Sequence, residues 1–220
     1  MKPRLDERTI ALRVAREFKD GDVVNLGYGI PGLAADFVPE GRNVIFLYEN
    51  GIVGAGPLAE PGRGDEDLIN ASSQYLTSAP GMSACSSAEV FDMISGGHVD
   101  ITVLGAYQVS ERGDLANWRT GQRHGIGMGG AMDLAVGAKR LIVAMLHTTR
   151  DGDFRIVKEC NYPLTARKCV DLIVTDLAVI EVTEEGLVLK EVAPGWSADE
   201  IRAVTEPRLT VAKPLQEIQL

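Results

Sequence analysis

The chain has 220 residues, of which 45% are hydrophobic and 24% are charged, and this length and composition predict one α/β domain spanning 1–220. A formal net charge of −9 and an aromatic content of 5% argue against binding to duplex or single-stranded nucleic acid. No apolar run approaches the length of a membrane span, and residues 1–20 are too charged for a signal peptide.

The cysteines and histidines form no recognisable metal-binding pattern. Cys85, Cys160 and Cys169 are odd in number and lack metal-ligand spacing, and the three histidines are scattered along the chain. We therefore expect reduced thiols in a cytoplasmic protein, with no bound metal.

Helix and strand patterns alternate through the first half of the chain. Asp6 is placed to cap a helix whose apolar stripe includes Ile10 and Val14. Ser86 and Glu89 have the spacing of a capping box at the start of a later helix. The elements expected up to residue 109 are helices at 7–19, 33–38 and 87–95 and strands at 22–26, 43–48 and 100–109.

The second half of the chain is richer in strand patterns. The glycine-dense segment 125–130 opens a helix that extends to Lys139, and Ser197 is expected to cap a final helix that ends at Val204. Residues 110–123 are polar and loop-like, and residues 207–220 carry weak signals that predict a C-terminal tail or a subunit contact. The expected strands are 141–146, 154–157, 172–182 and 187–192.

This order of elements predicts an open, largely parallel central sheet flanked by helices, with some antiparallel additions. In such sheets, ligands bind beyond the carboxyl ends of the strands. The glycine turns at 27–32, 51–56 and 125–130 follow strands or open helices. We expect them to converge on that edge of the sheet.

Glu49 stands directly between an apolar run and glycine-rich backbone. The successive N–H groups of segment 125–130 suit a phosphate, or the oxyanion that forms when a carbonyl is attacked. Asn50 and nearby backbone N–H groups are candidate donors to the Glu49 carboxylate. From the residues alone, Glu49 is either a carboxylate nucleophile or, more commonly for such a position, a hydrogen-bonded acid at a strand end.

The segment Glu49-Asn50-Gly51, followed by Gly54-x-Gly56, resembles the catalytic segment of family I coenzyme A transferases. The resemblance is specifically to the β subunits of 3-oxoacid CoA-transferases of the acetoacetate and 3-oxoadipate types. It covers about residues 5–205 and implies a CoA-transferase-like fold of the NagB/RpiA type. Further matching stretches, in the order of the family, are residues 24–31, 96–106, 113–118, 127–134, 163–165 and 175–179.

The resemblance implies that Glu49 is the nucleophile of a ping-pong reaction that passes through a glutamyl-CoA thioester. CoA moves from an acyl-CoA such as succinyl-CoA to a carboxylic acid such as a 3-oxoacid, with no other cofactor. The residues implied for the oxyanion or thioester site are Asn50, Gly129, Gly130 and Ala131. The residues implied for the substrate and CoA cleft are Asn25, Gly27, Gly29, Gly51 and Gly54.

The resemblance also implies that a second subunit is needed to complete the active site. In this family an α subunit supplies most of the CoA site, so we expect an α2β2 assembly that acts on acyl-CoA and carboxylic acids, with no membrane or nucleic-acid partner. Water must be kept from the thioester intermediate, so the acidic loop 57–68 is a candidate to close over the site. An ordinary solvated connection explains that loop equally well.

The chain departs from the family pattern near the regions expected to face the substrate. Tyr48 replaces the serine or glutamine that precedes the catalytic acid, and Ser-Ser-Gln-Tyr at 72–75 replaces Gly-Lys-Gln-Thr. Because of these departures, the resemblance does not define which acyl group is transferred. Two other functions also stay open: an acyl-CoA hydrolase of the same fold, in which water completes the reaction, and a non-catalytic ligand-binding module.

Overall fold

The computed structural model describes residues 2–71, 73–120 and 127–219 of the chain. The helices in these ranges are α1 (Glu7–Ala15), the 3-10 helix η1 (Ile30–Phe37), α2 (Ser87–Ser95), α3 (Ala131–Gly137) and α4 (Ala198–Ala203). The strands are β1 (Val23–Leu26), β2 (Ile45–Tyr48), β3 (Ile52–Val53), β4 (Ser83–Ala84), β5 (Ile101–Leu104), β6 (Gln108–Ser110), β7 (Leu115–Ala116), β8 (Arg140–Met145), β9 (Ile156–Val157), β10 (Leu172–Thr175), β11 (Ala178–Thr183), β12 (Gly186–Val192) and β13 (Leu209–Glu217).

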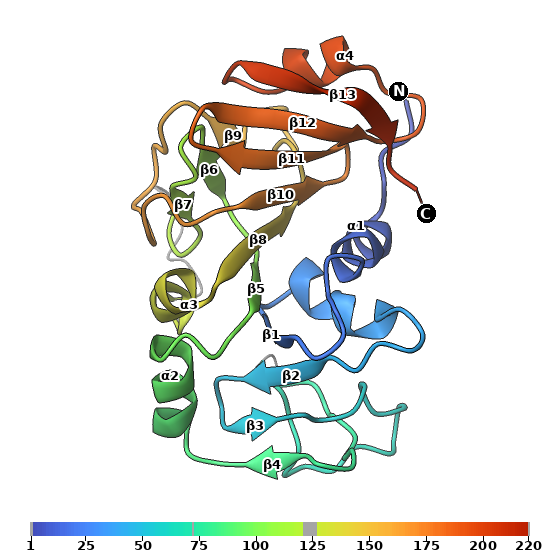
Figure 1. Cartoon of the computed structure of the whole chain (residues 1–220), viewed down its shortest axis with the longest axis vertical. Coiled ribbons are helices and arrows are strands. Elements are labelled where there is room, and N and C mark those ends of the chain that lie inside the picture. Colours follow the sequence, from blue (N-terminus) through green and yellow to red (C-terminus); the bar gives the residue numbers. More distant parts are fainter. Residues whose placement is uncertain (1, 72, 121–126, 220) are drawn as a thin grey trace.

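Ten strands form one sheet in the order β13-β12-β11-β10-β8-β5-β1-β2-β3-β4 (Figure 1). The five central strands, from β10 to β2, pair in parallel. Antiparallel pairs flank them on both sides, because β10–β11–β12 and β2–β3–β4 reverse direction from strand to strand. The expected fold class, a largely parallel open sheet with antiparallel additions, is confirmed.

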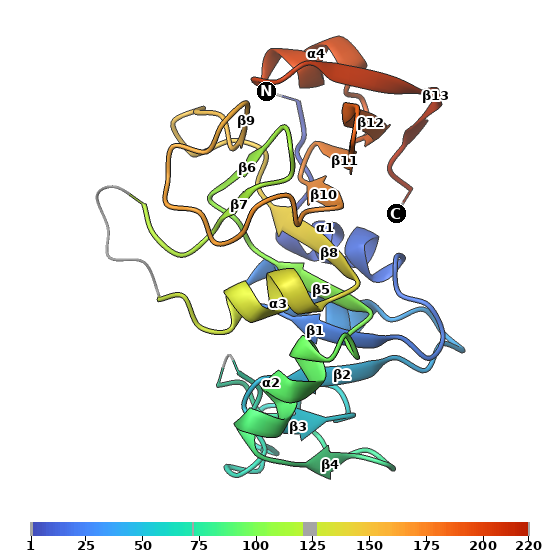
Figure 2. The same ribbon diagram turned by 60° about the vertical axis from the view of Figure 1, so that its left-hand side comes forward.

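Helices cover both faces of this sheet. The helices α1 and η1 lie on one face and α2 and α3 on the other, and the small sheet β7-β6-β9 extends the second layer (Figures 1 and 2). Each face has its own cluster of buried apolar side chains, one including Ile10 and Val14 of α1 and the other including Val90 and Ile94 of α2. None of the described helices is long and apolar enough to cross a membrane.

The helix starts follow the capping signals in the sequence. The Asp6 carboxylate accepts a hydrogen bond of 2.7 Å from the Thr9 N–H at the start of α1. Ser86 and Glu89 form the expected capping box of α2, in which the Ser86 N–H donates to Glu89 Oε2 at 2.7 Å. These caps satisfy backbone N–H groups that have no partner within the helix.

Two strands expected to be continuous are each divided. The apolar stretch 172–182 forms β10 and β11, which turn back on each other at Asp176-Leu177. The Thr175 hydroxyl oxygen accepts from the N–H groups of Leu177 and Ala178, which fixes this turn. The stretch 100–109 contributes β5 to the large sheet and β6 to the small one. Both stretches are largely buried, so hydrophobicity alone does not mark the breaks.

The C-terminal segment 207–220, expected to form a tail, contains the edge strand β13. It pairs in parallel with β12, from Leu187 opposite Leu209 to Val192 opposite Glu217, across a register shift. Few of its side chains are buried, which explains the weak signal in the sequence. The short helix expected at 33–38 is the 3-10 helix η1.

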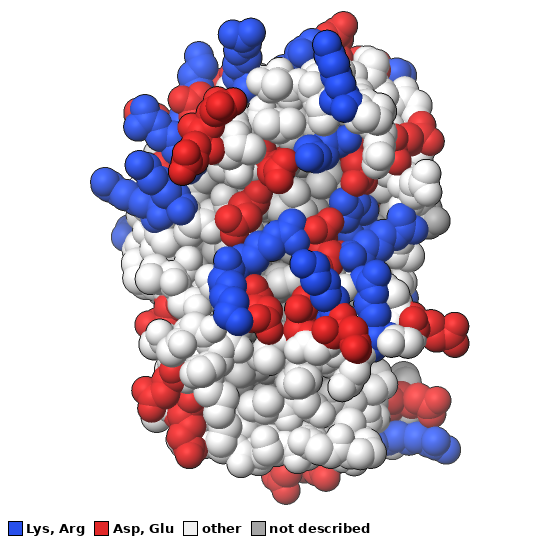
Figure 3. Space-filling model, in the orientation of Figure 1, with Lys and Arg blue, Asp and Glu red and all other residues white. Residues whose placement is uncertain are grey.

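A network of four charged side chains joins α1 to the sheet. The Arg13 guanidinium donates to both carboxylate oxygens of Glu191 at 2.7 and 2.8 Å and to Glu17 at 2.7 Å. Arg140 of β8 lies 2.8 Å from the other oxygen of Glu17. On the face shown in Figure 3, basic and acidic side chains interleave across the middle of the molecule. The network is part-buried, and it fixes the orientation of α1 against β8 and β12.

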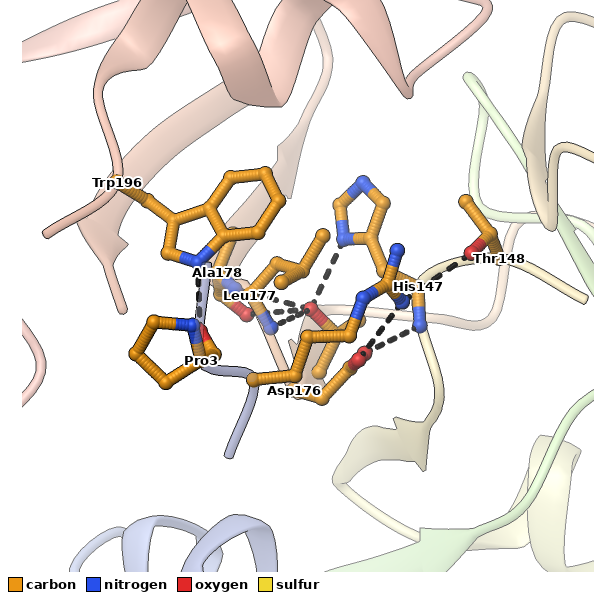
Figure 4. A network of polar contacts seen from close by, with 9 residues as sticks. Pro3, His147, Thr148, Asp176, Leu177, Ala178 and Trp196 are labelled. Carbon is orange, nitrogen blue, oxygen red and sulfur yellow. Dashed lines mark hydrogen bonds and ion pairs between the residues drawn. The ribbon is translucent and has the colours of Figure 1, made fainter. Parts of the chain in front are cut away.

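A second polar network surrounds His147 at the carboxyl ends of β8 and β10 (Figure 4). The imidazole is fully buried, and its Nδ1 and Nε2 lie 2.9 Å from the hydroxyl oxygens of Thr175 and Thr205. Asp176 accepts from the His147 N–H at 2.7 Å and from Arg4 at 2.9 Å. Burial, together with the charge of Arg4, lowers the pKa of His147 from its ordinary 6.5 to about 3.

We predict that the protein loses stability as the pH falls below 6.5. The unfolded chain protonates His147 near pH 6.5, whereas the folded chain does so only near pH 3, so the stability present above pH 6.5 is lost across that window. Urea unfolding should show a slope approaching about 1.4 kcal/mol per pH unit between about pH 6 and 5. A His147→Gln variant should lack this slope, and an unchanged slope would contradict the assignment.

Candidate active site

Glu49 opens the loop 49–51 that joins β2 to β3. Tyr48 pairs with Ile52 across this hairpin, and the Gly51 N–H donates to the Tyr48 carbonyl at 3.0 Å. Gly51 has a φ of 111°, a left-handed value that favours glycine in such a loop. The reversal therefore places Glu49, half-buried, at the carboxyl end of a strand of the parallel core.

Gly51 and Gly54 shape the hairpin and do not line the cleft. A Cβ at Gly51 would lie 2.2 Å from the Cys85 carbonyl oxygen, and the Cys85 N–H donates to the Gly51 carbonyl at 2.9 Å. Gly54 also has a positive φ, of 72°, and its N–H donates to the Phe46 carbonyl at 2.8 Å. The close approach at Gly51 is thus to backbone of the same chain, not to a ligand as the sequence suggested.

Tyr48, the residue in which this chain departs from the family pattern, faces away from the reactive side. It is buried in the apolar cluster that also contains Leu26 and Leu76. Burial raises the pKa of Tyr48 to about 12, and the nearby charge of Asp36 adds to the effect. We therefore assign Tyr48 to packing beneath the hairpin.

Asn25, on a central strand of the sheet, donates a hydrogen bond to the Glu49 carboxylate. Its side chain is fully buried on β1, and its Nδ2 donates to Glu49 Oε2 at 3.2 Å and to the Leu47 carbonyl at 3.0 Å. Its Oδ1 accepts a hydrogen bond of 3.3 Å from the Thr102 hydroxyl on β5. Because the β1 backbone pairs with both β2 and β5, this amide connects three adjacent strands to the carboxylate.

The glycine segment before α3 approaches Glu49 from the opposite layer. A Cβ at Gly130 would lie 3.4 Å from Glu49 Cγ and 3.0 Å from Phe91 Cζ on α2. Only glycine fits this contact without displacing a neighbour. The Ala131 N–H donates to the Met128 carbonyl at 3.3 Å, so the N–H groups of Gly129 and Gly130 are the stronger candidates to face a developing oxyanion.

These elements enclose a cleft of about 340 Å³, a size suited to a small-molecule ligand. In the described part of the chain, no group of three or more His, Cys, Asp and Glu side chains could hold a metal ion. The cleft wall combines Glu49, the ends of strands and the start of α3. Its lining residues are Leu26, Gly27, Tyr28, Glu49, Ala71, Leu104, Gly105, Ala106, Tyr107, Asn117, Gly127, Met128, Gly129, Gly130, Ala131 and Leu134.

The residues expected at the site fall into two groups. The first lies at the cleft: Glu49, Gly27, Gly129, Gly130 and Ala131 on the wall and Asn25 directly behind the carboxylate. The second lies elsewhere: Gly51 and Gly54 in the hairpin, Gly29 at the start of η1, and Asn50, whose Nδ2 donates to the Ile69 carbonyl at 2.7 Å. The expected donor from Asn50 to Glu49 is thus replaced by Asn25. Of the glycine segment 125–130, residues 125 and 126 lie outside the described residues.

Asn117 is a cleft residue that reasoning from the sequence missed. The Thr165 hydroxyl donates to Asn117 Oδ1 at 2.6 Å, and the Asn117 N–H lies 3.2 Å from the same hydroxyl oxygen. Both residues belong to stretches that match the family pattern, 113–118 and 163–165. A polar residue within each of two stretches that match the family was therefore the signal available in the sequence for this pair.

The family model described as coenzyme A transferase matches residues 8–203. The chain belongs to the coenzyme A transferase family. The family expected from the sequence is therefore confirmed, and the match covers every element of the cleft.

Three curated relatives align over nearly the whole chain. The B subunit of 3-oxoadipate CoA-transferase from Pseudomonas putida is 47% identical over 204 residues, which cover 92% of this chain and 95% of the relative. The B subunit of succinyl-CoA:3-ketoacid coenzyme A transferase from Helicobacter pylori is 45% identical, with coverage of 92% and 97%. The beta subunit of acetate CoA-transferase from Escherichia coli is 43% identical, with 95% of each chain covered.

Solved structures share the fold at lower identity. The acyl-CoA transferase YdiF of Escherichia coli O157:H7 superposes with a TM-score of 0.77 at 21% identity, over 100% of this chain and 44% of YdiF. The decarboxylase AibA/AibB superposes with a TM-score of 0.75 at 23% identity, over 99% and 90% of the two chains. Because a transferase and a decarboxylase share this architecture, the fold alone does not define the reaction.

We predict that Gly51→Ala destabilises the protein far more than Gly41→Ala. Both glycines have a positive φ, 111° and 82°, but only Gly51 has backbone within reach of an added Cβ. Gly41→Ala should cost about 1 kcal/mol in the free energy of unfolding, and Gly51→Ala at least about 2 kcal/mol more. Denaturant melts of the two variants test this, and equal losses would contradict the close contact with Cys85.

Proposed function

We propose that this chain is the B subunit of a 3-oxoacid CoA-transferase in which Glu49 is the nucleophile. The observation that carries the proposal is the position of Glu49 in the cleft, held by Asn25 at 3.2 Å and faced by the glycine segment at Gly130. The identities of 43–47% to B and beta subunits of CoA-transferases support the same assignment.

The proposed reaction is a double displacement at one carboxylate. A Glu49 oxygen attacks the thioester carbonyl of an acyl-CoA, the C–S bond breaks, and an acyl-glutamyl anhydride and CoA thiolate form. The thiolate attacks the glutamyl carbonyl, releases the first acid as its carboxylate and leaves a glutamyl-CoA thioester. A second carboxylic acid then reverses both steps and leaves as the new acyl-CoA. No water is consumed, so the thioester bond is conserved.

The residues at the cleft have distinct roles in this scheme. Asn25 directs one oxygen of Glu49 and leaves the other free to attack. The N–H groups of Gly129 and Gly130 stabilise the oxyanion that forms at the attacked carbonyl. Each developing charge lies within the cleft, where a few fixed donors act more strongly than they would in water.

The proposed assembly is α2β2 and cytoplasmic, with an A subunit that completes the CoA site. The relatives' names describe B or beta subunits, which supports a partner. The chain also spans 44% of YdiF and 42% of the succinyl-CoA:3-ketoacid coenzyme A transferase 2B of Mus musculus, so those single chains contain room for a second unit of similar size.

The decisive experiment combines the chain with an A-type subunit from its own genome. Succinyl-CoA is the donor, and acetoacetate, 3-oxoadipate and acetate are the acceptors, since the names of the relatives differ on this point. We expect new acyl-CoA that depends on a 3-oxoacid acceptor. CoA release that ignores the acceptor would indicate a hydrolase, carbon dioxide release a decarboxylase, and binding without turnover a ligand-binding module.

We predict that Glu49→Gln lowers transfer by at least about 10³-fold, because an amide cannot form the anhydride. Glu49→Asp should lose about 10²-fold, since withdrawing the carboxylate by one methylene misplaces the attack. Neither change should alter assembly with the A subunit. Steady-state assays with gel filtration check both points, and a Glu49→Gln enzyme with normal turnover would refute the mechanism.

We predict that Asn25→Ala slows transfer by about 10-fold or more, because Glu49 loses its orienting donor. The same change leaves the Leu47 carbonyl without a side-chain donor and should cost about 1–3 kcal/mol of stability. Thr102→Val is the matched control, since it removes a hydrogen bond to Asn25 but none to Glu49. The control should keep near-normal transfer; an equal rate loss in both variants would contradict the positioning role.

A further inference from the structure

Asn50 is adjacent to Glu49 but its side chain turns out of the cleft. Its Nδ2 donates to the Ile69 carbonyl at 2.7 Å, and this hydrogen bond joins the loop 49–51 to a distant part of the chain. Ile69 belongs to the segment that leaves β3 and returns to β4. We call its described residues, 57–71 and 73–77, the arm.

The arm is a packed structure despite its many charges. Isolated antiparallel β-bridges pair Leu58 with Leu76 and Ile69 with Tyr75. The Leu76 N–H also donates to the Leu68 carbonyl at 2.8 Å. The Tyr75 ring covers Gly64 so closely that a Cβ there would lie 2.3 Å from the ring. A segment with this many internal contacts holds a defined shape, unlike a solvated connection.

The arm reaches the mouth of the cleft. Ala71 lines the same cleft wall as Glu49, and it lies two residues beyond the Ile69 carbonyl that Asn50 binds. In Figures 1 and 2 the arm lies beside β3, and its Leu76 belongs to the same apolar cluster as Tyr48 of β2, the residue before Glu49. Through this hydrogen bond, the chain at Ala71 is held close to the loop that carries Glu49.

We propose that Asn50 is a positioning residue that fastens the arm beside Glu49 and so keeps water from the glutamyl thioester. The inference rests on the proposed function. The side reaction it suppresses is hydrolysis: water oxygen adds to the glutamyl carbonyl and the C–S bond breaks, while one water proton goes to the CoA thiolate and the other to solvent. That reaction regenerates Glu49 but loses the thioester energy that transfer must conserve.

The residue type at position 50 fits this role. The amide of asparagine donates to a carbonyl without adding charge next to the Glu49 carboxylate. An aspartate of the same shape has no donor when ionised, and its oxygen would repel the Ile69 carbonyl now 2.7 Å away. Asn50→Asp therefore breaks the link with the smallest change in volume, and Asn50→Ala breaks it without adding charge.

The test compares two rates in the complete assembly. Free CoA released from succinyl-CoA without acceptor measures hydrolysis, and new acyl-CoA formed with a 3-oxoacid measures transfer. We expect Asn50→Asp and Asn50→Ala to raise the ratio of hydrolysis to transfer by about 10-fold. Thr77→Val is the matched control, because it removes the hydrogen bond from Thr77 Oγ1 to the Pro57 carbonyl at the base of the arm, 2.9 Å long. Its ratio should match the wild type.

A second measurement applies even where a variant loses activity. Amide hydrogen exchange at Leu76, whose N–H bonds within the arm, should become faster in Asn50→Ala than in the wild type. An unchanged ratio with unchanged exchange overturns the inference. An equal fall in both rates also overturns it, since that result indicates a direct catalytic donor. Absence of transfer in the wild-type assembly instead removes the proposed function on which the inference rests.

Discussion

The hydrogen bond from Asn25 to Glu49 is the contact on which the rest of the site depends. Asn25 is fully buried within a ten-stranded sheet, and its amide joins the carboxylate to β2 through the Leu47 carbonyl and to β5 through Thr102. A buried amide is costly unless its donors and acceptor are satisfied. Here the contacts span three strands that pair in register, so the strand pairing that builds the fold also brings the Asn25 amide to Glu49.

The second constraint is steric and acts from the other layer. A Cβ at Gly130 would lie 3.0 Å from the Phe91 ring and 3.4 Å from Glu49 Cγ, so a side chain there would have to displace Phe91. The backbone of the glycine segment can therefore approach Glu49 closely. The tight loop at Gly51 acts differently, because it packs on Cys85 and lets β3 reverse against β2 directly after Glu49. Rigid secondary structure thus supports a carboxylate that lies on a loop.

The sequence was informative where the signal is local. Capping residues marked α1 and α2, and the acid followed by glycines marked Glu49. It was less informative where long-range contacts decide. The direction of the Asn50 side chain depends on Ile69, and the strand β13 depends on pairing with β12. The break between β10 and β11 was hidden because Thr175 and Asp176 are buried and lie between apolar runs that end at Val174 and resume at Leu177. The glycine segment was visible in the residues themselves, and the family resemblance joined it to Glu49. Four other residues assigned to the site lie off the cleft wall: Gly51 and Gly54 in the hairpin, Gly29 at the start of η1, and Asn50 against the Ile69 carbonyl.

The most direct test of the account is chemical trapping of the intermediate. The complete assembly is incubated with succinyl-CoA without acceptor, treated with borohydride, digested and examined by mass spectrometry. If Glu49 forms a glutamyl-CoA thioester, its carboxyl is reduced to an alcohol in the peptide that contains it, and omission of succinyl-CoA abolishes the change. An unmodified Glu49 in an assembly that carries out transfer would contradict the central claim.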